Sequence, residues 1–118
     1  MICFALLLQL LTQASPTEII FSAGAPVSAI QFEVETPGIF SKVSPGPAAQ
    51  VASKGVDYAY LMTENVYRVL VYGLNDFDIP SGVVATFEAQ GPILIKAVIF
   101  SNPKGDRVPQ SPTRLEIR

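Results

Sequence analysis

Three side chains with oxygen ligands lie close together in the segment NDFDIPSG, residues 75–82. Asn75, Asp76 and Asp78 have the hard ligands and the spacing that suit a cation such as Ca²⁺. The segment matches no EF-hand loop, because residue 80 is proline and no glutamate stands at the twelfth position from Asp76. Asn and Asp are also ordinary turn residues, since they hydrogen-bond their own main chain. The sequence therefore favours a turn between two strands, with calcium binding as the alternative.

Few residues of this chain could carry out catalysis. The sequence has no histidine and a single cysteine, Cys3, so the common general base, the Ser-His-Asp triad and thiolate chemistry are all disfavoured. The glycines fall singly and form no phosphate-binding loop. Asp76 and Asp78 could act as the paired carboxylates of a glycosidase, but nothing in the sequence places a substrate groove beside them. We expect a non-catalytic protein without a cofactor.

Composition sets the class of protein. The chain has 118 residues, of which 49% are hydrophobic and 15% charged, and this length fits one domain. The net charge is −2 and no basic run is present, which argues against nucleic acid as a partner.

The N-terminal residues differ from the rest of the chain. An apolar run from Ile2 to Leu11 is followed by Thr12, Gln13 and Ala14, which is typical of a secretory signal peptide with cleavage after Ala14. The run is too short for a transmembrane helix. We therefore expect a signal peptide over residues 1–14, a secreted or cell-surface protein, and no membrane span. The alternative is that these residues are the remnant of a truncated first strand.

From residue 18 onward, apolar residues recur with a period of two, which indicates strands. Breakers such as Thr36-Pro37-Gly38 and Gly91-Pro92 separate the apolar segments. About seven or eight short strands at a spacing of 8–12 residues predict an all-β domain over residues 18–118, folded as an antiparallel β-sandwich.

The alternation also predicts which side chains face the core. In GVVATFEAQ we expect an inward set and an outward set; the inward set is Val83, Ala85, Phe87 and Ala89, and the outward set is Val84, Thr86, Glu88 and Gln90. In ILIKAVIF we expect one shared side for Ile93, Ile95, Ala97 and Ile99. In VYRVLVYGL, Tyr67, Val69 and Val71 face one way, while Arg68, Leu70 and Tyr72 face the other.

Tyr58 and Tyr60 share one side of an extended segment. Exposed aromatic rings can stack on sugars, so these two tyrosines form a candidate sugar platform. The alternative is that both rings pack at the edge of the sandwich with their hydroxyls in water.

Several segments together resemble a known family, the bacterial and archaeal cohesin modules of secreted polysaccharide-degrading systems. The likeness rests on GAPVSAIQFEVE, GPAAQVASKG, YRVLVYGLNDFDIPSGVVATFEA and AVIFSNPKGDRVP with TRLEIR. The resemblance implies a jelly-roll-like sandwich of about nine strands, related in fold to some carbohydrate-binding modules. It also implies binding of a dockerin-like protein partner through one sheet face, in a polysaccharide-degrading or cell-surface assembly. In this family the calcium belongs to the dockerin.

The period-two pattern nominates the face that would bind a partner. If YRVLVYGL and GVVATFEA are paired strands, as the resemblance suggests, their outward residues form one surface, made of Arg68, Leu70, Tyr72, Thr86 and Glu88. Apolar and charged side chains mixed in this way are typical of a protein interface. The alternatives are an ordinary outer sheet face, a polysaccharide-binding module of the same fold, and a purely structural envelope domain.

Overall fold

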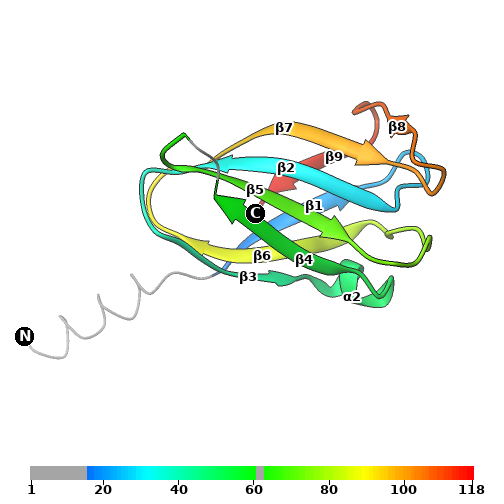
Figure 1. Ribbon diagram of the computed structural model, residues 1–118, viewed down its shortest axis with the longest axis horizontal. Helices are drawn as coiled ribbons and strands as arrows, with labels where there is room; N and C mark the ends of the chain where they lie inside the picture. The colour runs from blue at the N-terminus through cyan, green and yellow to red at the C-terminus, as the bar shows by residue number, and fades with distance from the viewer. Residues whose placement is uncertain (1–15, 61–62) are drawn as a thin grey trace, which may run out of the picture.

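The computed structural model describes residues 16–60 and 63–118 (Figure 1). Within these residues the chain forms nine strands and one short helix. In chain order they are β1 (Thr17–Ser22), β2 (Ala29–Glu35), β3 (Phe40–Pro45), α2 (Pro47–Val51), β4 (Gly55–Tyr60), β5 (Val66–Tyr72), β6 (Gly82–Ala89), β7 (Leu94–Ser101), β8 (Arg107–Val108) and β9 (Arg114–Ile117). The predicted signal peptide, residues 1–14, lies outside the described residues.

The strands of the described part form two antiparallel sheets. The four-stranded sheet has the order β3-β6-β1-β9, and the five-stranded sheet has the order β4-β5-β2-β7-β8. The sheets stack face to face (Figure 1), which confirms the predicted antiparallel β-sandwich. Both form because each strand carries apolar residues at every second position, and these can be buried only against a second sheet.

The core lies between the two sheets. Phe21 of β1 and Phe100 of β7 meet there, with ring centroids 5.6 Å apart, and so join one sheet to the other. Burying such a side chain contributes about 1.5–3 kcal/mol relative to leaving it in water. The largest fully buried side chains are Phe21, Phe32, Phe87, Phe100, Ile19, Ile30 and Ile79.

The chain between β3 and β4 contains the short helix. β3 continues through Pro45, and proline is tolerated because β3 is an edge strand. α2 follows, with Pro47 in its first turn. Gly46 allows α2 to lie close to β6, because a Cβ at this position would collide with the Val83 carbonyl oxygen.

A β-bulge in β6 changes the predicted alternation there. Ile19 pairs with Ala85 and Ile20 with Val83, so Val84 is an extra residue in the strand. Val84 is fully buried, although the sequence predicted that it faces outward. Val83, predicted to face inward, is only half-buried. Strict period two fails here because the extra residue lets two successive residues, Val84 and Ala85, face the core.

A second bulge lies in β7. The register with β2 shifts there, and Ala97 has a φ of +53°, in the left-handed region. Before the bulge, Ile93 and Ile95 pack against the core, as predicted. After it, Val98 packs against the core, Ala97 is exposed and Ile99 lies on the outer face, so the prediction that Ala97 and Ile99 share the side of Ile93 and Ile95 is wrong.

Candidate functional site

The outer face of the five-stranded sheet carries the β5 part of the nominated surface. Val69 and Val71 are fully buried, so the alternating residues Arg68, Leu70 and Tyr72 lie on the opposite side of the strand, away from the core. Tyr72 is exposed, and the other two are half-buried. The predicted orientation of β5 is therefore confirmed.

Thr86 and Glu88 lie on the other sheet. β5 pairs with β2 and β4, whereas β6 pairs with β1 and β3, so the expectation that β5 and β6 are paired strands is wrong. The reason is the connection over residues 73–81, which carries the chain from one sheet to the other instead of closing a hairpin. Ile79 in this connection is buried, and its N–H donates to the Val27 carbonyl at 2.8 Å. The five nominated residues thus belong to two outer faces.

One row of cross-strand neighbours crosses the middle of the five-stranded outer face. Leu70 lies beside Asp57 of β4 and Gln31 of β2, and Gln31 in turn lies beside Ile99 of β7. Two aliphatic side chains therefore flank an amide near the centre of the sheet. Ile99 was missed at the sequence level, because only the bulge in β7 brings it to this side.

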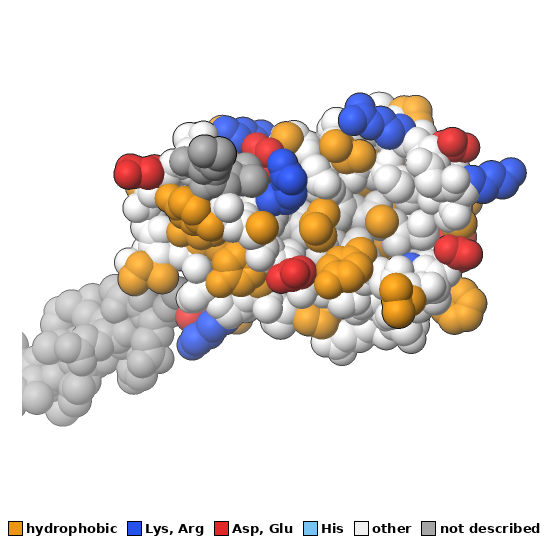
Figure 2. All heavy atoms as spheres, viewed as in Figure 1, with side chains coloured by type: hydrophobic (Ala, Val, Ile, Leu, Met, Phe, Trp, Pro, Cys, Tyr) orange, Lys and Arg blue, Asp and Glu red, His pale blue; other side chains and the backbone are white. Residues whose placement is uncertain are grey.

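Charged groups on this face lie mainly on β2 and its neighbours. Lys96 forms an ion pair with Glu35 at 3.2 Å, and Arg68 lies beside Glu33 of β2. The Nε atom of Arg68 is buried and forms no hydrogen bond within the described residues. Figure 2 views this face and shows hydrophobic side chains gathered across its middle, with charged groups scattered between them.

The outer face of the four-stranded sheet is occupied by polar groups that satisfy one another. The hydroxyls of Ser44 and Thr86 are 2.8 Å apart, and Lys42 contacts the carboxylate of Glu88 at 3.2 Å. Two further ion pairs involve the last strand and the residue that follows it; they are Arg118 with Glu18 at 2.9 Å and Arg114 with Glu116 at 2.7 Å. These side chains have their partners on the same face.

Tyr58 and Tyr60 share one side of β4, as predicted. The side is the inner one, yet their side chains remain exposed because β4 is an edge strand. The ring of Tyr58 meets that of Phe40 edge-on at 5.4 Å, and the ring of Tyr60 meets that of Tyr67 edge-on at 5.1 Å. The Tyr60 hydroxyl accepts a hydrogen bond from the N–H of Asn65 at 3.3 Å. The two rings thus form the open edge of an aromatic cluster, and a role in sugar binding stays a prediction.

Asn75 has the hydrogen bonds of a turn residue. Its Oδ1 accepts from the N–H of Phe77 at 3.2 Å, and its Nδ2 donates to the Ser53 carbonyl at 3.3 Å. The side chain is thus held within the loop. Among residues 16–60 and 63–118, no group of three or more acidic, His or Cys side chains is placed to hold a metal ion.

A lysine lies beside the two acidic residues of this loop. Lys54 is 5% exposed, and its Nζ donates to the Asn75 carbonyl at 2.6 Å. Burial lowers the pKa of Lys54 from its usual 10.5, while the carboxylates of Asp76 and Asp78 act in the opposite direction. Lys54 thus interacts electrostatically with both carboxylates of the loop.

Comparisons with protein-family models, curated proteins and solved structures found no match. In the part of the chain that the structure describes, no helix has the length and apolar character needed to cross a membrane.

Proposed function

We propose that this chain is a non-catalytic binding module of the cohesin type, secreted or held at the cell surface, that binds a dockerin-like protein partner through the outer face of the five-stranded sheet. The observation that supports this most is the difference between the two outer faces. On one, most of the polar groups are paired with each other; on the other, Leu70, Tyr72 and Ile99 add apolar side chains to a face that also carries charged residues.

Arg68 adds a polar contact to this surface. It lies beside Glu33 of β2 and brings a charged group to the apolar part of this face. Tyrosine and arginine beside aliphatic side chains on one sheet face have the composition expected of a protein interface.

The test uses purified, calcium-loaded dockerin modules as probes, with affinity measured by calorimetry. Leu70→Asp should weaken binding about a hundredfold, because it places a charge among apolar contacts. Thr86→Asp is the matched control on the opposite face and should change the affinity less than about twofold, since it lies outside the proposed contact. Equal losses for both variants would contradict the choice of face.

A polysaccharide ligand is the second candidate function, and the exposed edges of Tyr58 and Tyr60 favour it. Its test is retardation of the protein in gels that contain soluble cellulose, xylan or pectin derivatives. Retardation that is lost in Tyr58→Ala and Tyr60→Ala would favour this function. Unretarded migration in all three, together with no dockerin binding, would favour a purely structural envelope domain.

A further inference from the structure

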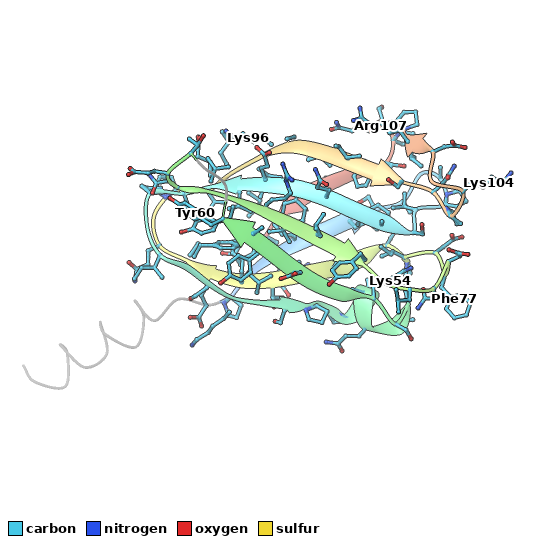
Figure 3. All side chains as sticks on the ribbon, viewed as in Figure 1. Lys54, Tyr60, Phe77, Lys96, Lys104 and Arg107 are labelled. Atoms are coloured by element: carbon cyan, nitrogen blue, oxygen red, sulfur yellow. The ribbon has the colours of Figure 1, made fainter. Side chains whose placement is uncertain are left out.

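The connection between β5 and β6 exposes two large apolar side chains at one end of the sandwich. Leu74 is fully exposed and Phe77 is 66% exposed, whereas Ile79, two residues later, is buried. Figure 3 places Phe77 at the end of the molecule where Lys104 also lies, opposite the end that carries Tyr60. Leaving a leucine and a phenylalanine in water on one short loop forgoes the burial that stabilises the rest of the domain.

The loop is held in place on both sides of the exposed residues. Lys54 and Ser53 anchor Asn75, as described above, and the N–H of Ile79 donates to the Val27 carbonyl. Between these anchors, the Asn75 side chain accepts the Phe77 N–H. Leu74 and Phe77 are therefore presented by a preorganised loop, which lowers the entropic cost of binding through them.

Acidic residues flank Phe77 in the loop. Asp76 and Asp78 belong to the same loop, and Asp78 also lines an open cavity of about 480 Å³ together with Asp106 and Lys104. Within the described residues, none of the three carboxylates forms an ion pair. Lys54 is too buried to present its charge to a partner, so Lys104 alone among the cavity-lining residues offers an exposed positive group.

We propose that this tip, defined as Leu74, Asp76, Phe77, Asp78 and Asp106, is a second docking surface, and that its partner is a protein segment in which apolar side chains are flanked by lysine or arginine. Apolar contacts would cover Leu74 and Phe77, and the cavity beside Asp78 would receive a basic side chain. This surface lies at the end of the sandwich and does not depend on the sheet face proposed above.

Charge complementarity selects this partner over two others. An anionic membrane would be repelled by the carboxylates of Asp76 and Asp78, which flank Phe77 in the chain. In a symmetric contact between two copies, the same patch faces itself, so carboxylates would be placed against carboxylates. A basic and apolar protein segment satisfies both properties of the tip.

The probe is a phage-displayed library of random 12-residue peptides, selected on the immobilised full-length protein. We expect enriched peptides that combine lysine or arginine with apolar residues, and binding of the synthesised peptides is then measured by calorimetry. Phe77→Ser and Asp78→Asn should each weaken the affinity roughly tenfold or more, since exposed anchors and their charge partners dominate such contacts. Ile39→Ser is the matched control, because Ile39 is 64% exposed and lies in the connection between β2 and β3.

Several outcomes would overturn the proposal. They are a library that yields no enriched peptide, enriched peptides that are acidic or uncharged, and affinities that Phe77→Ser and Ile39→Ser reduce equally. Cosedimentation of the protein with phosphatidylcholine–phosphatidylglycerol vesicles, lost in Phe77→Ser, would assign the tip to a membrane surface instead. Dimerisation in analytical ultracentrifugation, lost in the same variant, would assign it to a second copy of the chain.

Discussion

The two outer faces of this sandwich are built from similar strands but present different chemistry to the solvent. On the four-stranded sheet, Ser44 contacts Thr86 and Lys42 contacts Glu88, so polar groups on this face satisfy one another. On the five-stranded sheet, Lys96 is likewise paired with Glu35, but Leu70 and Ile99 lie as apolar groups on either side of Gln31. A surface whose polar groups are already paired gains little from a partner, whereas exposed apolar groups gain by being covered.

The two β-bulges affect the outer faces differently. In β6, the extra residue turns Val84 into the core, while Val83 takes the outward position beside Ile20, so the number of apolar side chains on this face is unchanged. In β7, the bulge at Ala97 moves Ile99 out of the inner row and adds an apolar side chain to the five-stranded outer face. The bulge in β7 thus helps to make the five-stranded face more apolar.

The largest expected effect tests the bulge in β6. Val84→Ala should lower the free energy of unfolding by about 2 kcal/mol, because two buried methyl groups are lost and a cavity remains. Val83→Ala, the neighbouring and matched change, should cost less than about 1 kcal/mol, since Val83 is only half-buried. Urea unfolding followed by circular dichroism measures both values. Equal costs, or a larger cost at Val83, would mean that β6 alternates without the bulge and that Val84 belongs to the outer face.

Much of the fold could be predicted from the sequence, because a strand with one face on the core and the other in solvent must alternate apolar and polar residues. The pattern over Ala29–Glu35 and Val66–Tyr72 led directly to strands with the correct inner faces. The bulges could not be predicted in this way. Ala97 adopts a positive φ although alanine has no local preference for it, so the surrounding register imposes that backbone.

The candidate surface could be predicted only in part, for a related reason. The side of β5 on which Leu70 and Tyr72 lie follows from local periodicity. Which strand lies beside β5 depends on the path of residues 73–81, and a loop rich in turn residues can close a hairpin or cross between sheets. The buried Ile79, an apolar residue just before Pro80, was the one local signal that this connection enters the core.

A smaller effect on stability is expected in the loop that follows β5. Lys54 holds the Asn75 carbonyl next to β5, and burial lowers its pKa below the usual 10.5. Between its folded-state pKa and 10.5, the unfolded chain binds more protons at this site than the folded chain, so stability rises with pH. The stability gained when Lys54 is deprotonated is present in full above pH 10.5 and is lost as the pH falls through the folded-state pKa.

Lys54→Met removes this contribution, so the difference in the free energy of unfolding, wild type minus variant, should rise as the pH increases toward 10.5. Urea titrations at a series of pH values measure the trend, and Lys104→Met controls for the loss of one positive charge at an exposed site. A difference that falls with pH would show that the charged form of Lys54 is the one favoured in the folded protein. The loop would then depend on the ammonium charge rather than on the neutral amine.

The smallest effect is expected on the polar face. Glu88→Gln removes the carboxylate that Lys42 contacts at 3.2 Å, and because the Lys42 side chain is 73% exposed, the cost to stability should be under about 0.5 kcal/mol. The cost should fall further in 0.5 M salt, which screens exposed charges. In the dockerin calorimetry, the same variant should leave the affinity unchanged. If Glu88→Gln weakened binding as much as Leu70→Asp, the four-stranded face would take part in recognition. Its charged groups would then contact a partner instead of only pairing with each other.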